Sequence, residues 1–215
     1  MNKNIEKSTK CDIIVEKGGQ KMSNLIELEA GYKLTDFKNI LKKIKEYDYK
    51  LNYRVTEQDT YYTDKDLEFI KNRICLRTRK VNNESLELTF KPRSDANTEK
   101  YGKKEVNIQL KVEDLEDIKF IIKNLGYDEY VSFIKHRTVY SKEEFGFEHN
   151  IMLDEIEGVG YFAELELVSH NETEKEQLHA ELENYIKRFE CENLEKKDQP
   201  YRDIVREAQN KTQTN

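Results

Sequence analysis

Proline and glycine are scarce in this chain of 215 residues, which has two prolines, eight glycines and no tryptophan. Because proline and glycine interrupt regular structure, their scarcity predicts long, regular elements. The three cysteines, Cys11, Cys75 and Cys191, are far apart, which excludes a disulfide framework and a CxxC metal site. The sequence also lacks a signal peptide and any apolar run of membrane-spanning length, so we expect a cytoplasmic protein without a membrane partner.

The charge balance is acidic and the surface must be very polar. Charged residues make up 37% and hydrophobic residues 36% of the sequence, and the net charge is −6 with an isoelectric point near 5.5. Proteins that coat nucleic acid are usually basic, so no nucleic-acid partner is expected. The 13 tyrosines and nine phenylalanines indicate a folded chain rather than a disordered one.

The length fits a single domain, which we place at residues 23–207. Residues 1–22 are polar apart from a short Ile-Ile-Val run and match none of the later patterns. Two interpretations of this segment stay open, a disordered tail or a non-native leader that precedes a start at Met22. Residues 208–215 are expected to form a loose polar tail.

Alternation of apolar and polar residues predicts about eight strands, of which Glu27 to Leu34 is the clearest. Helical spacing of apolar residues predicts helices after Thr35, at 115–125 with Gly126 as the C′ residue, from about 172 to 189, and at 199–208. The other expected strands are residues 59–64, 72–80, 84–92, 103–110, 131–140, 146–158 and 161–169.

Two pairs of glutamates on the expected strands need an explanation. Glu27 and Glu29, like Glu164 and Glu166, are two positions apart and therefore share a face, roughly 6–7 Å from each other. Carboxylates this close repel by about 2–3 kcal/mol at an effective dielectric constant near 20. On a single strand with a solvated face such charges would mean little.

Taken together, the charges on the expected strands are sorted by sign, with acids on the first and last strands and bases on the middle ones. A solvated surface would favour opposite charges side by side, because like charges on neighbouring positions are destabilising. We therefore predict an α+β fold in which an eight-stranded antiparallel sheet closes into a barrel, with helices packed outside and charges lining a tunnel.

The sorted charges indicate the kind of ligand. Clustered carboxylates without histidine or cysteine suit Mg²⁺ or Mn²⁺. Clustered arginine and lysine suit phosphate oxygens. A polyphosphate bound to a metal ion would satisfy both groups, and the ion would neutralise the paired glutamates.

At these residues the sequence resembles the CYTH domains, the triphosphate tunnel metalloenzymes. "IELEAGYKL" is similar to their ExExK signature, and the ending "QPYRDIV" is similar to that of class IV adenylyl cyclases and their close relatives. The order and spacing of the pieces make the resemblance specific over roughly residues 25–205. The other pieces are "LRTR" (76–79), "LTFKP" (88–92), Lys103 to Glu105, "KHR" (135–137) and "LDEIEGVGYFAELE" (153–166).

The resemblance implies an eight-stranded antiparallel barrel that holds a triphosphate-bearing small molecule and Mg²⁺ or Mn²⁺. By position, the implied metal-side residues are Glu27, Glu29, Asp154, Glu164 and Glu166. The implied phosphate-side residues are Arg77, Arg79, Lys91, Lys103, Lys135 and Arg137. Two departures from the family pattern stand out. Gly31 replaces the signature lysine, with Lys33 on the same face as a candidate substitute, and Asn107 stands where a further carboxylate is common.

Three functions stay open within this resemblance. The first is an adenylyl cyclase, in which the ribose 3′-hydroxyl of ATP attacks the α-phosphorus. The second is a triphosphatase acting on inorganic, thiamine or nucleoside triphosphate, and the third is a nucleotide-binding or polyphosphate-binding module without catalysis. The similar ending favours the cyclase, whereas the missing signature lysine favours the module. The apolar stripe from Leu178 to Phe189 is expected to pack inside the domain, with homodimerisation as the alternative.

Overall fold

The computed structural model describes residues 26–93, 105–169, 175–190 and 194–213. The segment 1–22, with the question of Met22, and the candidate Lys103 lie outside the described residues. The strands are β1 (Ile26–Leu34), β2 (Lys50–Thr63), β3 (Cys75–Val81), β4 (Ser85–Lys91), β5 (Val106–Leu110), β6 (Asp128–Glu144), β7 (Phe147–Ile156), β8 (Gly160–Ser169) and β9 (Glu195–Lys196). The helices are α1 (Lys38–Glu46), α2 (Glu68–Lys71), α3 (Leu115–Asn124), α4 (Lys175–Phe189) and α5 (Tyr201–Gln213), with a 3₁₀ turn at Val112–Asp114.

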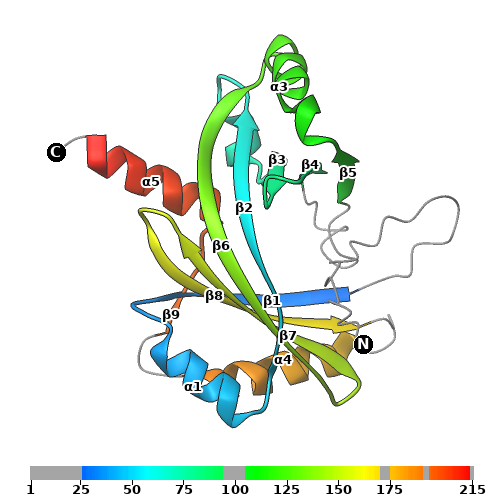
Figure 1. Ribbon diagram of the computed structural model, residues 1–215, viewed down its shortest axis with the longest axis vertical. Helices are drawn as coiled ribbons and strands as arrows, with labels where there is room; N and C mark the ends of the chain where they lie inside the picture. The colour runs from blue at the N-terminus through cyan, green and yellow to red at the C-terminus, as the bar shows by residue number, and fades with distance from the viewer. Residues whose placement is uncertain (1–25, 94–104, 170–174, 191–193, 214–215) are drawn as a thin grey trace, which may run out of the picture.

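The strands form one antiparallel sheet in the order β5-β4-β3-β2-β6-β7-β8-β1-β9. The α+β class and the antiparallel sheet are confirmed, but the closed barrel is not, because no hydrogen bonds join β1 to β5 among the described residues. The long strands β2 and β6 run between the two ends of a strongly curved sheet (Figure 1). Part of the edge of β1 that closure would need is taken by β9, which pairs with Tyr32 and Lys33.

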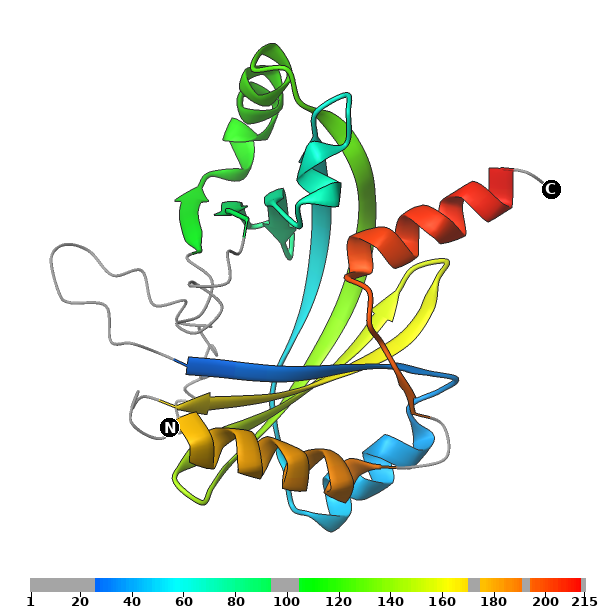
Figure 2. The ribbon, with the colours of Figure 1, turned by 180° about the vertical axis from the view of Figure 1, so that it is seen from behind.

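The convex face of the sheet carries the main hydrophobic core. Helices α1 and α4 lie together against this face beneath β1, β7 and β8 (Figure 2). The helical spacing of Ile40 and Ile44 and of Leu178 and Tyr185 places these side chains against the sheet, where they are buried. The outward-facing residues of β8, such as Leu165, complete this cluster. The opposite, concave side is called the inner face below.

Helix α5 covers one end of the inner face. Its residues Tyr201 and Val205 pack on Phe133 of β6 and Phe162 of β8, and the ring centroids of Phe162 and Tyr201 are 5.1 Å apart. The helix continues to Gln213, so the expectation of a loose tail from residue 208 is wrong for the described residues. The C-terminal turns of α5 are anchored to β6, because Gln209 Nε2 donates a hydrogen bond of 3.3 Å to the Ser132 carbonyl oxygen.

Several element boundaries differ from those expected. Strand β2 begins at Lys50, nine residues before the predicted strand at 59–64. Its first half pairs with the long strand β6 but shows no clear apolar alternation, so the sequence pattern did not indicate it. The strand expected at 72–80 begins at Cys75, after the one-turn helix α2. The end of α3 is confirmed, since Gly126 follows the helix with a φ of 94° that favours glycine.

No helix in the described ranges is both long and apolar enough to cross a lipid bilayer.

Candidate functional site

Strand alternation and register bring eleven of the twelve predicted site residues to the inner face, and the twelfth, Lys103, lies outside the described residues. Directly paired residues of antiparallel strands share a face. Glu29 lies opposite Glu166, Arg137 lies opposite Asp154, and the series continues across β6, β2, β3 and β4. The eleven residues are Glu27, Glu29, Lys33, Arg77, Arg79, Lys91, Lys135, Arg137, Asp154, Glu164 and Glu166.

Three carboxylates at the β1 and β8 end form no ion pair with a described residue. Burial raises the pKa of Glu166 to about 7, and the negative charge of Glu27 adds to the rise. The pKa values of Glu27 and Glu29 are also raised, chiefly because the protein removes part of the water around each carboxylate. The negative charge of Glu105 adds to the rise for Glu27, and that of Glu164 adds to the rise for Glu29. Glu27 and Glu29 nonetheless remain exposed to solvent, so they line a wet concave surface rather than a sealed core. Within the described part of the chain, no direct ion pair neutralises these three carboxylates at this end of the inner face.

The other two predicted metal-side residues are already paired with cations. Arg137 donates hydrogen bonds of 2.7 and 2.6 Å to the two oxygens of Asp154, and one of 2.7 Å to Glu164. Tyr201 Oη donates a further bond of 2.9 Å to Asp154, and Lys197 Nζ lies 3.0 Å from Glu164 Oε1. Burial alone would raise the pKa of Glu164, but Arg137 and Lys197 lower it to about 2. Asp154 and Glu164 are therefore compensated without a bound ion.

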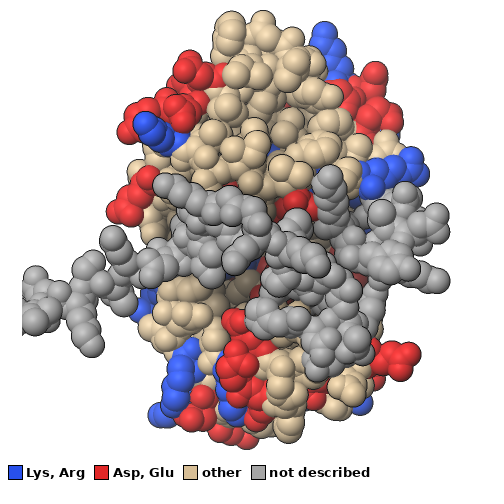
Figure 3. Space-filling model, turned by 90° about the vertical axis from the view of Figure 1, so that its right-hand side faces the viewer, with Lys and Arg blue, Asp and Glu red and all other residues tan. Residues whose placement is uncertain are grey.

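The basic side of the inner face is paired with acids that the sequence analysis did not include. Arg79 is bound to Asp59 and lies 3.0 Å from Glu57, while Lys135 Nζ lies 2.7 Å from the other oxygen of Glu57. The sorting of charges by sign is thus wrong for this part of the sheet. Seen from the right-hand side of Figure 1, both acidic and basic side chains of described residues lie around the rim of the molecule (Figure 3). Glu57 lies in the half of β2 that was not predicted, and Asp59 begins the expected strand at 59–64 but was not recognised as part of the charged face.

Arg77 is a basic residue of the inner face that has an unused hydrogen-bond donor among the described contacts. Its side chain is buried, and its Nη2 donates a hydrogen bond of 3.1 Å to Thr89 Oγ1. Its Nε has no hydrogen-bond partner among the described residues, although it is fully shielded from solvent. Its ion pairs are long, 3.9 Å to Asp59 and 3.5 Å to Glu87. A buried guanidinium held this loosely could turn toward an anionic ligand.

The two remaining described lysines of the prediction contribute less clearly. Lys91 ends β4 and forms an ion pair of 2.6 Å with Glu105, which precedes β5. Lys33 is exposed, lies beside β9, and pairs in register with Phe162. No ion pair links Lys33 to a carboxylate of the inner face in the described part of the chain, so its role as a substitute for the signature lysine stays a prediction.

The chemistry of the carboxylate end fits a divalent cation. Glu27, Glu29 and Glu166 offer only oxygen ligands, the kind that Mg²⁺ and Mn²⁺ prefer. Burial and neighbouring carboxylates raise their pKa values, and a bound cation would oppose both effects. Among the described residues, no three acidic, histidine or cysteine side chains already converge as a metal site. A bound ion would therefore require rotation of these long side chains, two of which are exposed and free to turn.

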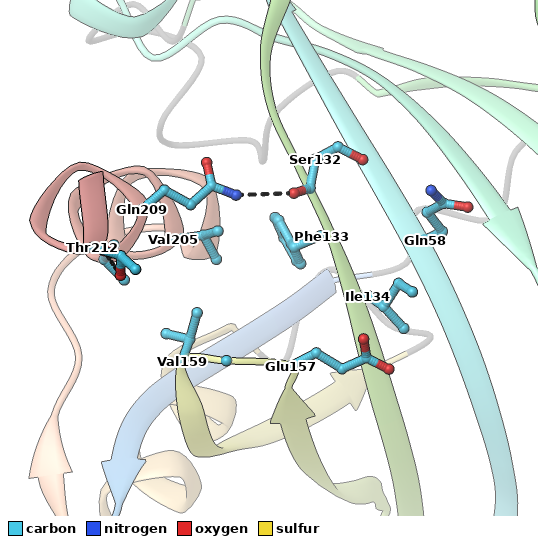
Figure 4. Close-up of a pocket in the computed structure, with 11 residues that line it drawn as sticks. Gln58, Ser132, Phe133, Ile134, Glu157, Val159, Val205, Gln209 and Thr212 are labelled. Atoms are coloured by element: carbon cyan, nitrogen blue, oxygen red, sulfur yellow. Dashed lines mark hydrogen bonds between the residues drawn. The ribbon is translucent and has the colours of Figure 1, made fainter.

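A separate pocket of about 470 Å³ lies away from the charged inner-face residues. It is enclosed by α5, β2, β6 and the turn between β7 and β8, with Val205 and Phe133 among its walls (Figure 4). Glu157 is its only charged lining residue, and none of the predicted site residues contributes to it. This pocket lacks the charges that a polyphosphate would need.

Comparison with known proteins supports the resemblance noted in the sequence. The family model "CYTH domain" matches residues 25–200. A protein of Methanocaldococcus jannaschii is 29% identical over 164 residues, which cover 76% of this chain and 89% of that protein. Its name is "Putative adenylate cyclase".

Solved structures share the fold at lower sequence identity. An X-ray structure of "a putative adenylate cyclase" from Vibrio parahaemolyticus has a TM-score of 0.62 and 19% identity, covering 83% of this chain and 97% of that one. A "putative adenylyl cyclase" from Hippeastrum has a TM-score of 0.61 and 14% identity, covering 85% of this chain and 96% of that one. The Hippeastrum protein is described as having a dominant triphosphatase activity.

Proposed function

The chain belongs to the CYTH domain family, and from this premise we propose that its inner face binds a triphosphate-bearing small molecule together with Mg²⁺ or Mn²⁺ and acts on it as an enzyme. The family acts on triphosphate substrates and implies a divalent metal cofactor. The observation that carries the proposal is the division of the inner face. Uncompensated carboxylates lie at one end, and a buried guanidinium with a spare donor lies on the other side.

At the carboxylate end, Glu27, Glu29 and Glu166 would hold the cation. When bound, the cation supplies polarisation of phosphoryl oxygens and neutralises the like charges of its ligands. Asp154 and Glu164 have a different role in this proposal, because their charges already serve to hold Arg137. They fix the guanidinium plane at the border between the acidic and basic parts of the inner face.

On the basic side, Arg77 would bind the phosphate groups directly. Arg79 and Lys135 are tied to Asp59 and Glu57, so they set the shape and positive potential of this wall. Guanidinium groups bind phosphate oxygens in a bidentate manner and hold a leaving polyphosphate in line with the attacked phosphorus. Stabilisation of the departing negative charge is the main catalytic effect expected of these residues.

The reaction that we propose is that of an adenylyl cyclase. The ribose 3′-hydroxyl of ATP loses its proton to water, and its oxygen forms a bond to the α-phosphorus. The bond from that phosphorus to the bridging oxygen breaks, and pyrophosphate leaves with cyclic AMP as the other product. Two observations support this choice. The named Methanocaldococcus relative matches over most of its length. In addition, the C-terminal segment that resembles class IV cyclases is placed on the inner face, where Tyr201 bonds to Asp154.

Hydrolysis is the second candidate, because the Hippeastrum protein with the same fold is described as a triphosphatase. In that reaction water attacks the terminal phosphorus and orthophosphate is released. Binding without turnover is the third outcome, and the glycine at position 31 of the signature is the feature that favours it.

One assay separates the three. The protein is incubated with ATP, thiamine triphosphate or inorganic triphosphate, each with Mg²⁺ or Mn²⁺, and the products are identified by chromatography and mass spectrometry. Cyclic AMP with pyrophosphate supports the cyclase, orthophosphate supports the triphosphatase, and metal-dependent binding without product supports the module. Absence of both binding and product with every substrate would overturn the proposed function.

A further inference from the structure

A lysine outside the signature reaches the inner face at the position of Gly31. Lys197 follows β9 directly, and its backbone N–H donates a hydrogen bond of 2.8 Å to the carbonyl oxygen of Gly31. Its side chain then crosses over this glycine. A Cβ atom placed on Gly31 would overlap Cε of Lys197 and lie 3.2 Å from its Nζ, so the end of the lysine side chain would have to shift. Glycine at position 31 therefore leaves the observed path of the lysine side chain open.

The ammonium group of Lys197 is held firmly at the inner face. Nζ lies 3.0 Å from Glu164 Oε1, and both side chains are only 11% exposed. The same Nζ lies 3.8 Å from the ring centroid of Tyr201, which is a close cation–π contact. Glu164 forms an ion pair with Arg137 as well as with Lys197. The two cations flank Glu164 beside the uncompensated carboxylates of β1 and β8.

We propose that Lys197 is a phosphate-binding residue of this site and supplies the positive charge that Gly31 removes from β1. The inference rests on the proposed function and names a residue that acts in it. An ammonium group has three N–H donors, and Glu164 accepts one of them. No described residue accepts a hydrogen bond from the other two, which leaves them for a phosphoryl oxygen that approaches from the inner face. In this account, the glycine at position 31 and the lysine at position 197 form one functional pair.

The test uses isothermal titration calorimetry of the full chain with inorganic tripolyphosphate in the presence of Mn²⁺. Lys197→Met keeps the length of the side chain and its packing on Tyr201 but removes the charge. Gly31→Ala keeps the lysine and displaces it. Lys196→Met is the matched control, since Lys196 is the adjacent lysine and its side chain is 75% exposed.

We expect Lys197→Met to weaken tripolyphosphate binding about tenfold to a hundredfold, the usual effect of losing a hydrogen bond to a charged group. Its affinity for Mn²⁺ alone should not fall. Gly31→Ala should weaken tripolyphosphate binding as well, and the double variant should be no weaker than Lys197→Met, because both changes remove the same contact. Lys196→Met should bind like the wild type.

Each other outcome has a defined meaning. If the wild type binds tripolyphosphate and Lys197→Met binds it equally well, the inference is overturned and the proposed function stands. If Lys197→Met loses melting temperature and Mn²⁺ affinity together with tripolyphosphate affinity, Lys197 is only a structural partner of Glu164 and the inference is again overturned. If the wild type binds no tripolyphosphate, the proposed function fails and the inference fails with it.

Discussion

Arg79 on β3 and Asp59 on β2 face each other in register and share two hydrogen bonds, 2.6 Å from Nε to Oδ1 and 2.8 Å from Nη2 to Oδ2. Both groups are largely removed from solvent, with side-chain exposures of 17% and 1%. A buried bidentate pair of this kind costs desolvation to form, but removal of one partner leaves an uncompensated charge. The pair therefore fixes the basic wall of the inner face instead of binding substrate itself.

The first prediction concerns the stability of this pair. Asp59→Asn should lower the free energy of unfolding at pH 7 by about 3 kcal/mol, since it leaves the Arg79 charge without its counter-ion. Urea denaturation of the wild type and the variant measures this difference. A difference below about 1 kcal/mol would contradict the structural role assigned to Asp59.

The same pair predicts a pH dependence of stability. Burial alone would raise the pKa of Asp59, but Arg79 lowers it from 3.8 to about 2. Because the folded-state pKa lies below the unfolded value, the stabilisation is complete above about pH 4 and is lost as the pH falls through 2. The loss attributable to this group is about 2–3 kcal/mol. Asp59→Asn should lack this part of the acid dependence in urea titrations between pH 5 and pH 2, and an unchanged profile would contradict the account.

The third prediction assigns phosphate binding to Arg77. Arg77→Met should weaken tripolyphosphate binding in the presence of Mn²⁺ about tenfold to a hundredfold, because charge-assisted hydrogen bonds to phosphate are lost. Arg54→Met is the matched control, since Arg54 is an exposed arginine of β2 on the other face of the sheet. Calorimetry measures both. Equal affinities of the two variants would remove Arg77 from the proposed site.

Metal binding is predicted to depend on Glu166. Glu166→Gln should weaken Mn²⁺ binding at least tenfold, because it removes one of three carboxylates that lack a cationic partner. Glu155→Gln, on β7, is the control, because Glu155 is exposed and faces away from the inner face. The loss of free Mn²⁺ signal in electron paramagnetic resonance reports the affinity. Similar affinities in both variants would contradict the assignment of the metal to this end.

Packing beneath the site gives a further prediction. Leu165 of β8 is 1% exposed and faces the main core. Its neighbours in sequence, Glu164 and Glu166, point to the opposite side of the sheet, the inner face. Leu165→Ala should destabilise the fold by about 2–5 kcal/mol through lost burial and a residual cavity. Leu51→Ala, at a position that is 45% exposed, should change stability by about 0.5 kcal/mol or less. Thermal or urea unfolding of both variants distinguishes a core position from a surface one.

The sequence predicted the faces of the strands better than it predicted how the sheet ends. Alternation at Glu27 and Glu29 and at Glu164 and Glu166 correctly placed these residues on a common face, because strand geometry alone determines the side on which a residue lies. Closure of the sheet was not predictable in the same way, since it depends on which segment pairs with the free edge of β1. The two-residue strand β9 is too short to give a periodic signal.

The ion-pair partners of the charged site residues were also not predicted from the sequence. Glu57 and Asp59 neutralise Arg79 and Lys135. Glu57 was missed because β2 was predicted too short, whereas Asp59 lay within the expected strand and was missed because its pairing with Arg79 follows from the register of β2 and β3. Lys197 was missed for another reason. Its approach to the inner face depends on a three-dimensional relationship with Gly31, a residue 166 positions earlier in the chain, and no local pattern marks it.

The central claim is that carboxylates and cations of one inner face bind a single metal–triphosphate ligand. The most direct test is the affinity for tripolyphosphate, measured by calorimetry with and without Mn²⁺ in the wild type and in Glu166→Gln. If both ligands occupy this face, linkage requires Mn²⁺ to strengthen tripolyphosphate binding, by about tenfold or more for a coupling above 1.4 kcal/mol. The account predicts that this coupling is present in the wild type and lost in Glu166→Gln. Equal affinity with and without Mn²⁺ in the wild type, or full coupling in Glu166→Gln, would contradict it.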